Sequence, residues 1–331
     1  MEEHIEKSEE VLLSVKNLTT HYVTREIGTC EAVRNVSFDI HKGETLGLVG
    51  ETGAGKTSIA LSILRLLPVP PAKIVEGEIY WGAKNLLKVH EREMRKIRGG
   101  EISMVFQDPM TALNPVDTVG DQIAEVIYLH QKVTKVESKR LAAEMLEVVG
   151  IPKERFGEYP HQFSGGMKQR VIIAMALACN PKLLIADEPT TALDVTIQAQ
   201  VLRMMNDLKS KNGTAVLLIT HDLGVIAEMC QRVAVIYSGE IVEMGTAEDL
   251  FDRTAHPYTM GLFDSLPRVS SGDRLIPIPG MMPDPSNLPK GCKFAERCKY
   301  ATDVCREQEV DLTEIEPGHY CRCIHKLTKE G

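Results

Sequence analysis

The feature that most constrains the fold of this chain is a glycine-rich stretch, "GETGAGKT", at residues 50–57. The apolar run "TLGLV" precedes it, and the helix-forming run "SIALSILRLL" follows it and ends at Pro68. Glycines let a backbone curl so that its N–H groups point inward, and the start of a helix adds a positive dipole end. This strand, loop and helix therefore predict a phosphate-binding loop within an α/β fold.

The loop indicates which groups would hold a nucleotide. Lys56 is expected to reach the β- and γ-phosphates, and the Thr57 hydroxyl is expected to ligate Mg²⁺. The residues that we expect to line the nucleotide site are Gly50, Glu51, Thr52, Gly53, Ala54, Gly55, Lys56, Thr57 and Ser58. ATP together with Mg²⁺ is therefore the expected ligand.

A phosphate loop of this kind also needs an acidic residue at the end of a second apolar strand. The run "LLIADEP" at 183–189 supplies it. Asp187 is placed to hold Mg²⁺, directly or through water, and Glu188 is placed to polarise the attacking water. An Asp-Glu pair is by itself usually a solvated strand end, so this interpretation depends on the phosphate loop upstream.

Apolar strands and helical segments alternate along most of the chain, which predicts a largely parallel, doubly wound sheet. A helical block at 117–160 interrupts this alternation. We expect one domain over residues 1–250 with a helical subdomain at about 108–170. From residue 251 proline becomes dense and periodicity fades, so 251–331 is expected to be a loop-rich extension.

Charge and hydropathy exclude some classes of function. The formal net charge of −8 over 331 residues argues against a protein that binds nucleic acid through general charge. The longest apolar run, "VIIAMALAC" at 171–179, is too short to span a bilayer, and no secretory signal is visible. A role at a membrane would therefore require a partner protein.

Four further motifs resemble those of ABC-type ATPases. They are "FSGGMKQR" at 163–170, which resembles the signature motif, "VFQDP" around Gln107, "TTALD" ending at Asp194, and "LLITHD" with His221. The resemblance covers residues 11–250. It implies a P-loop NTPase core with an antiparallel β subdomain and an inserted helical subdomain, followed here by the cysteine-containing extension.

The resemblance also implies a role for each matching position. Ser164, Gly165 and Gly166 would start a helix and contact the γ-phosphate bound on a second subunit in a head-to-tail dimer. Gln107 would sense Mg²⁺ and the attacking water, and His221 would contact the γ-phosphate. Glu188, His221 and Gln107 are therefore the expected catalytic residues.

Two other positions are assigned by the same resemblance. Asp194 would lie at the dimer seam, and Tyr22 would stack on adenine; an ordinary strand aromatic is the alternative for Tyr22. Met167 stands where glutamine is most common in the family, outside the groups expected to contact phosphate.

Longer stretches, including "VFQDPMTALNPV" and "HPYTMGLFDSLP", resemble the ATPase subunits of dipeptide and oligopeptide ABC importers. This implies an ATP-hydrolysing, energy-coupling subunit at the cytoplasmic face of the cell membrane, bound peripherally. Its partners would be a second ATPase subunit, related or identical, and two membrane-spanning permease subunits. An extracytoplasmic substrate-binding protein would act indirectly, and nucleic acid would take no part.

Three alternatives remain open at this level. The importer could carry another solute, such as nickel or an oligosaccharide, because the ATPase does not touch the substrate. The chain could also be a non-transport ABC-type ATPase that acts on DNA or ribosomes, or the ATPase of an exporter.

Five of the eight cysteines lie in "GCKFAERCKYATDVC" at 291–305 and "GHYCRC" at 318–323. Disulfides are a poor explanation without a secretory signal. No pair has the short spacing common in zinc sites, and widely spaced thiolates suit an iron–sulfur cluster at least as well. The set that resembles the cysteines of many peptide importer ATPases is Cys292, Cys298, Cys305 and Cys323, with Cys321 as the alternate. A [4Fe–4S] cluster is the favoured occupant and zinc the alternative.

Overall fold

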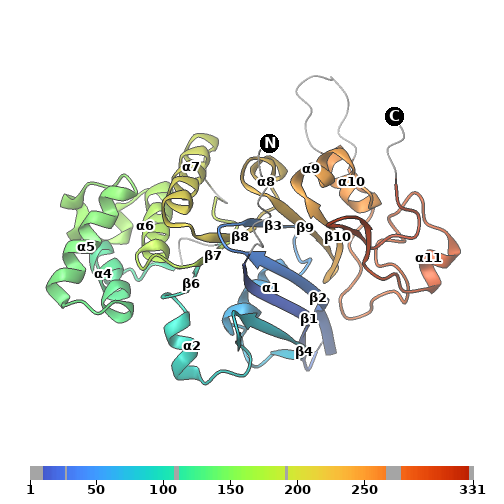
Figure 1. The fold of residues 1–331 in the computed structure, drawn as a ribbon, viewed down its shortest axis with the longest axis horizontal. Coiled ribbons are helices and arrows are strands. Elements are labelled where there is room, and N and C mark those ends of the chain that lie inside the picture. Colours follow the sequence, from blue (N-terminus) through green and yellow to red (C-terminus); the bar gives the residue numbers. More distant parts are fainter. Residues whose placement is uncertain (1–9, 27, 108–111, 191–192, 266–276, 328–331) are drawn as a thin grey trace, which may run out of the picture. The chain divides into compact units, whose positions relative to one another are not determined.

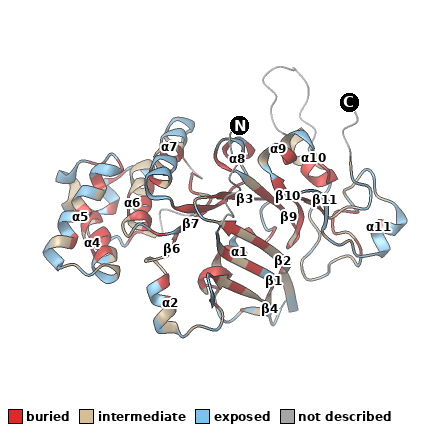
Figure 2. Cartoon of the chain, viewed as in Figure 1, coloured by how far each residue is buried: buried red, intermediate tan, exposed pale blue. Residues whose placement is uncertain are grey.

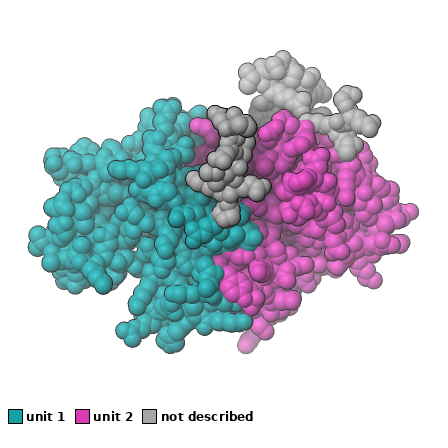
Figure 3. Space-filling model, viewed as in Figure 1, with its two compact units in different colours: residues 1–13, 39–45, 81–218 teal, residues 14–38, 46–80, 219–331 magenta. Residues whose placement is uncertain are grey.

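The computed structural model describes residues 10–26, 28–107, 112–190, 193–265 and 277–327 (Figure 1). The chain divides into two compact units, coloured separately in Figure 3. Unit 1 comprises residues 1–13, 39–45 and 81–218, and unit 2 comprises residues 14–38, 46–80 and 219–331.

Unit 1 contains the strands β6 (Ile102–Val105) and β7 (Leu183–Asp187) and most of β8 (Ala215–Ile219), in the order β8-β7-β6. β6 and β7 run parallel, with Ile102 opposite Leu183. All five residues of β7 are buried (Figure 2), as expected for a parallel strand covered on both faces. The apolar strand predicted before Asp187 is therefore confirmed.

The helices of unit 1 begin at side chains that accept a hydrogen bond from the first turn, a preferred way to start a helix. Figure 1 shows α4, α5 and α6 packed together. The caps are Thr118 for α4 (Val119–His130), Thr134 for α5 (Lys135–Val148), Ser164 for α6 (Gly165–Leu177) and Asp194 for α7 (Val195–Asn212). The described part of unit 1 also contains the short helices α2 (Glu91–Ile97), η1 (Lys153–Gly157) and η2 (Pro160–Gln162). The helical block expected at 117–160 is present as α4, α5, η1 and η2.

Unit 2 contains most of the strands β2 (Gly28–His41), β1 (Val11–Thr24) and β4 (Ala72–Trp81), which are neighbours in that order in one sheet. The short strand β5 (Lys84–Asn85) belongs to unit 1. The helices α1 (Lys56–Leu64) and α8 (Leu223–Met229) also belong to unit 2.

A second set of strands in unit 2 combines parallel and antiparallel pairing. β3 (Thr45–Val49) pairs in parallel with β9 (Arg232–Tyr237), whereas β9 pairs antiparallel with β10 (Glu240–Thr246). The change of direction has a local cause. Only Ser238 and Gly239 separate β9 from β10, and both have positive φ, 47° and 83°, which suits a two-residue hairpin turn.

The C-terminal extension adds two strands that the sequence analysis did not predict. β12 (His319–Cys321) pairs antiparallel with β10, and β11 (Thr313–Glu316) pairs with β12. The helices α9 (Ala247–Asp252), α10 (Pro257–Asp264) and α11 (Asp303–Glu307) are short. Most of the described stretch 277–312 lies outside helices and strands, so the expectation of a loop-rich extension is confirmed.

Among the described helices, none has both the length and the hydropathy that crossing a membrane requires.

Candidate nucleotide site and thiol pocket

The glycine-rich loop in unit 2 has a shape that its glycines alone permit. Gly53 and Gly55 have φ of 84° and 103°. A Cβ atom on Gly50 would lie 2.2 Å from the carbonyl oxygen of Ile236, and one on Gly55 would lie 2.3 Å from that of Ala32. The loop therefore curls against neighbouring backbone in a way that a larger residue would prevent.

Lys56 closes this loop from within. Its Nζ donates to the carbonyl oxygens of Gly50 at 2.7 Å and Glu51 at 3.0 Å, and the residue is buried. α1 begins at Lys56, so the N–H groups of its first turn have no partner within the helix. Thr57 is exposed at this end. An ammonium group, a hydroxyl and helix N–H groups thus converge where phosphates and Mg²⁺ would fit.

Tyr22 on β1 lies beside the start of α1. Its hydroxyl is 3.2 Å from Oγ of Ser58, and the side chain is half-buried. This places an aromatic ring next to the phosphate loop within unit 2. Its stacking on adenine stays a prediction.

Unit 1 brings together two of the residues that were expected to act on water. β6 and β7 are parallel neighbours, so Gln107 and Glu188, which follow them, lie at the same edge. The Gln107 side-chain amide donates to Oε2 of Glu188 at 2.9 Å. Glu188 has a φ of 46°, a left-handed backbone that is costly for a residue with a side chain and is concentrated at functional sites. Asp187, the residue before it, is 1% exposed.

The signature residues stand at the start of α6 in unit 1. Ser164 caps this helix by accepting from the Met167 N–H at 3.4 Å, and Ser164 and Gly165 are exposed. A Cβ on Gly166 would lie 2.6 Å from Cγ2 of Ile197, so Gly166 allows α6 to approach the first turn of α7. The predicted helix start is confirmed, and it is open to an outside ligand.

Asp194 has a local role that the sequence analysis missed. Its Oδ1 accepts from the Ile197 N–H at 3.0 Å and caps α7. An aspartate directly before a helical run is itself a capping signal, so this role could have been predicted. His221 follows β8 in unit 2 and is exposed, just before Asp222 caps α8.

The extension gathers four of its five cysteines around one pocket in unit 2. The four are Cys292, Cys298, Cys305 and Cys323, and none is disulfide-bonded. Cys321, which is fully buried at the end of β12, is not among the described residues that line this pocket. The structure therefore places Cys323, rather than the alternate Cys321, with the other three thiols.

The environment of Cys292, Cys298 and Cys323 favours the protonated form of these three thiols. Burial raises the pKa of Cys323 to about 11, and the nearby thiols of the pocket add to this effect. Burial also raises the pKa values of Cys292 and Cys298. A metal that bound here would have to displace protons, so its affinity would increase with pH.

The pocket thiols do not form the tight ligand group of a tetrahedral zinc site. A tetrahedral zinc site, with Zn–S bonds of about 2.3 Å, holds its sulfurs about 3.8 Å apart. Among the described residues, the one group of three candidate ligand atoms within 4.8 Å of one another contains no cysteine. No three of the pocket thiols in the described part of the chain therefore lie within 4.8 Å of one another.

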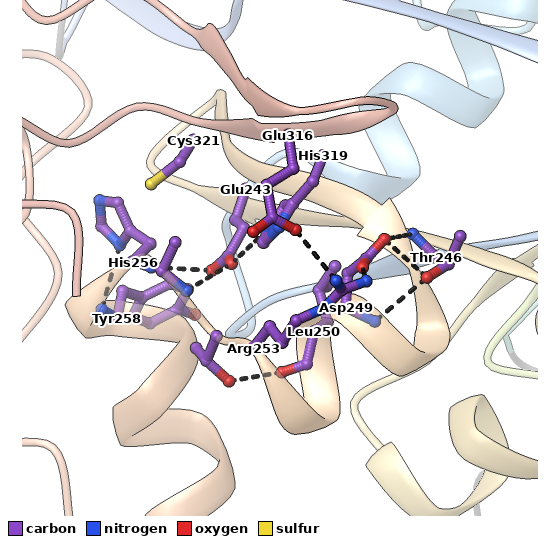
Figure 4. Close-up of polar contacts among 12 residues, drawn as sticks. Glu243, Thr246, Asp249, Leu250, Arg253, His256, Tyr258, Glu316, His319 and Cys321 are labelled. Atoms are coloured by element: carbon purple, nitrogen blue, oxygen red, sulfur yellow. Dashed lines mark hydrogen bonds and ion pairs between the residues drawn. The ribbon is translucent and has the colours of Figure 1, made fainter. Parts of the chain in front are cut away.

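The three close ligand atoms belong to Asp249, Glu316 and His319, and this cluster was not predicted from the sequence. Figure 4 shows that the Arg253 guanidinium bridges the two carboxylates; it contacts Asp249 and lies 3.0 Å from Glu316. Burial raises the pKa of Asp249, but hydrogen bonds from Thr246 and the charge of Arg253 outweigh burial and lower it. A resident cation therefore already balances these carboxylates.

Glu243 connects the extension to β10 beside this cluster. It is fully buried and accepts hydrogen bonds from the backbone N–H groups of Ala255 and His256, at 2.7 and 3.0 Å (Figure 4). Its Oε1 also lies 2.9 Å from Nε2 of the buried His319. Both ends of the extension are thus fastened to one strand through one carboxylate.

Two family models match this chain. One, described as ABC transporter, matches residues 33–191, and the other, described as Oligopeptide/dipeptide transporter, C-terminal region, matches residues 242–305.

Curated relatives match almost the whole chain. A probable peptide ABC transporter ATP-binding protein of Sinorhizobium fredii is 54% identical and covers 95% of both chains. The oligopeptide transport ATP-binding protein OppD of Bacillus subtilis is 51% identical over 94% of this chain and 88% of its own. The dipeptide transport ATP-binding protein DppD of the same species is 50% identical over 95% of this chain and 94% of its own.

Solved structures show the same cassette. A dimeric ATP-binding cassette in a post-hydrolysis state with ADP and Pi matches with a TM-score of 0.64 and 29% identity, over 71% of this chain and 98% of that one. A dimeric bacterial ABC transporter cassette gives a TM-score of 0.64 with 30% identity, over the same shares.

The chain belongs to the family of ABC transporter ATP-binding proteins. It is an ABC-type ATPase, an enzyme that uses ATP with Mg²⁺, and its fold is the α/β cassette of that family.

Proposed function

We propose that this chain is the energy-coupling ATPase subunit of an importer for dipeptides or oligopeptides. The observation that carries this proposal is the similarity over the extension as well as the cassette, since a peptide-transporter C-terminal region matches residues 242–305. Peptide transport is also named for relatives about half identical over 94–95% of the chain. Nickel and oligosaccharide remain the competing substrates.

We propose the following roles for the nucleotide site. The loop Gly50–Ser58 cradles the phosphates, with Lys56 on the β- and γ-phosphates. Thr57, Asp187 and Gln107 hold Mg²⁺, and Glu188 accepts a proton from the attacking water. His221 contacts the γ-phosphate, and Tyr22 stacks on adenine. The exposed helix start Ser164–Gly166 fits the role of contacting the nucleotide of a second ATPase subunit, with Asp194 at the same seam.

The proposed assembly follows from these roles. A second ATPase subunit, related or identical, faces this one head to tail, and two permease subunits carry the pathway through the membrane. An extracytoplasmic binding protein delivers the substrate to the permease. The chain then lies at the cytoplasmic face as a peripheral subunit, with a cassette over residues 1–250, its helical subdomain at about 108–170, and the extension over 251–331.

Uptake by the purified complex tests the substrate. The tagged chain, extracted from membranes in mild detergent, is expected to bring two permease subunits with it. In proteoliposomes supplied with the binding protein, labelled short peptides should accumulate only with ATP. ATP-driven uptake of nickel or an oligosaccharide, but not of peptides, would reject the peptide class. Recovery of the chain without any membrane protein would contradict a transport role.

We further propose that the thiol pocket holds a [4Fe–4S] cluster through Cys292, Cys298, Cys305 and Cys323. Their shared pocket supports a common ligand, and their wide spacing in the sequence favours a cluster over zinc. A bound cluster would supply four metal–thiolate bonds to a segment with few strands and helices, and so stabilise its fold. The chain's own contribution is to place the four thiols in an apolar setting beside Phe294.

Two serine variants distinguish the ligands of the cluster. Cys323→Ser should lose iron, acid-labile sulfide and the broad visible absorption of anaerobically purified protein, because it removes a thiol from the pocket. Cys321→Ser should keep all three, because Cys321 is not among the described residues that line the pocket. Loss of iron in Cys321→Ser alone would reverse the assignment. Stoichiometric zinc without iron in the wild-type protein would show that the pocket binds zinc rather than a cluster.

A further inference from the structure

An ion pair in unit 2 joins the extension to the phosphate loop. The guanidinium of Arg297 meets the carboxylate of Glu51 through two hydrogen bonds, Nη1 to Oε2 at 2.9 Å and Nη2 to Oε1 at 3.1 Å. The Arg297 side chain is 6% exposed, whereas that of Glu51 is 30% exposed. A paired, forked contact of this kind fixes the orientation of both groups, and burial of the cation strengthens it.

Arg297 is held in place independently of Glu51. Its Nε donates to the carbonyl oxygen of Pro279 at 2.8 Å, and its Nη1 lies 3.3 Å from the Tyr237 hydroxyl. The guanidinium also lies over the rings of Tyr237 and Phe294, at 5.7 and 5.9 Å from their centres. The cation is therefore preorganised by the extension and by β9 before it meets the loop.

Glu51 lies at the point where the loop is closed. Its backbone N–H donates to the buried Tyr258 hydroxyl at 3.0 Å. Its carbonyl oxygen accepts from Lys56 Nζ at 3.0 Å and from the Ala54 N–H at 3.2 Å. A displacement of Glu51 would therefore move a carbonyl that positions Lys56.

We propose that Arg297 is a positioning residue for ATP binding. It acts through Glu51, which it holds so that the loop keeps the curled shape and the Lys56 orientation that phosphates require. This inference rests on the proposal that Gly50–Ser58 binds the nucleotide. It gives the extension a role in nucleotide affinity, although Arg297 and Glu51 are 246 residues apart in the sequence.

Nucleotide affinity of the full-length chain tests this proposal. Arg297→Met removes the guanidinium fork and keeps an unbranched apolar stem, and we expect the Kd for Mg–ATP to rise on the order of tenfold. The KM for ATP should rise by the same factor, with kcat close to wild type, since Arg297 contacts no reacting atom. The Kd of Arg297→Lys should lie between those of the wild type and Arg297→Met, because an ammonium group keeps the charge but cannot make the forked contact.

A second variant and a coupling measurement guard against misfolding. Glu51→Gln leaves the extension unchanged and should raise the Kd by a similar factor. The double variant should be no weaker than either single variant, because both remove the same contact. Arg306→Met is the matched control, since Arg306 is exposed and pairs only with the neighbouring Asp303 among the described residues; its Kd should equal that of the wild type.

Two outcomes would overturn the proposal. One is an unchanged Kd in both Arg297→Met and Glu51→Gln, and the other is fully additive losses in the double variant. Lys56→Ala, measured alongside, separates this failure from a failure of the proposed nucleotide site. If Lys56→Ala loses affinity while the Arg297 and Glu51 variants do not, the site stands and the positioning role falls. If Lys56→Ala also binds normally, the nucleotide site itself is misplaced.

Discussion

Glu188→Gln is expected to stop ATP turnover while ATP binding persists. A positioned general base contributes about 10²–10⁴-fold to a rate, and the amide of glutamine has no comparable basicity. The variant should nevertheless keep its local geometry. Gln107 donates to Oε2 of Glu188, and an amide oxygen at that position can accept the same hydrogen bond. Phosphate release should therefore fall by about 10²–10⁴-fold, with a Kd for Mg–ATP close to that of the wild type.

Two companion variants make this result specific. Glu144→Gln makes the same change on an exposed carboxylate of α5 and should turn over ATP normally. Ser164→Arg fills the exposed start of α6 and should block ATP-dependent dimer formation, seen by size-exclusion chromatography, while the monomer still binds ATP. Wild-type turnover in Glu188→Gln would remove Glu188 from the mechanism. Loss of monomer binding in Ser164→Arg would contradict a site shared between subunits.

Lys56→Ala is expected to weaken nucleotide binding itself. A hydrogen bond between charged partners contributes about 1.5–3 kcal/mol, which corresponds to a factor of about 10–150 in Kd. The loss of nucleotide affinity should exceed that expected from the phosphate contact alone. Lys56 also donates hydrogen bonds to the carbonyl oxygens of Gly50 and Glu51 and so holds the loop closed. Titration with a fluorescent ATP analogue measures the effect.

The control for this variant is Lys73→Ala. Lys73 is an exposed lysine on β4 in the same unit, so its removal changes net charge equally without touching the loop. Its Kd for the analogue should match that of the wild type. The smallest effect expected for this contact is about tenfold in Kd. A Kd for Lys56→Ala within about twofold of the wild-type value would therefore show that Lys56 does not contact the phosphates.

The parts of the site that the sequence predicted are those whose geometry is local. The loop of residues 50–57 carries its own turn, helix start and charged group, so eight residues predict one structure. The helix start at Ser164 and the buried strand before Asp187 are equally local, and both are present. By contrast, the contact between Gln107 and Glu188 depends on the parallel pairing of β6 with β7, two strands far apart in the sequence.

Unlike the cap at Asp194, the other missed features have no local signal. Arg297 and Glu51 are 246 residues apart, and nothing in either neighbourhood indicates the other. β11 and β12 have four and three residues, too few to show a strand period. The choice between Cys321 and Cys323 depends on where β12 ends. Residues that are two positions apart on a strand share a face. However, β12 ends at Cys321, and Cys323, beyond the strand, lines the pocket.

The pairing of β12 with β10 has a consequence for solubility. β10 lies within the proposed cassette, yet one of its edges is covered by a strand from the extension. A chain cut at residue 250 would present the backbone of β10 as an open edge, a ready template for pairing with other chains. The edge that the full chain presents is β11 instead, "TEIE", which is short and carries two glutamates. The extension thus replaces a mostly buried strand at the rim with a short, mostly exposed one whose glutamates resist aggregation.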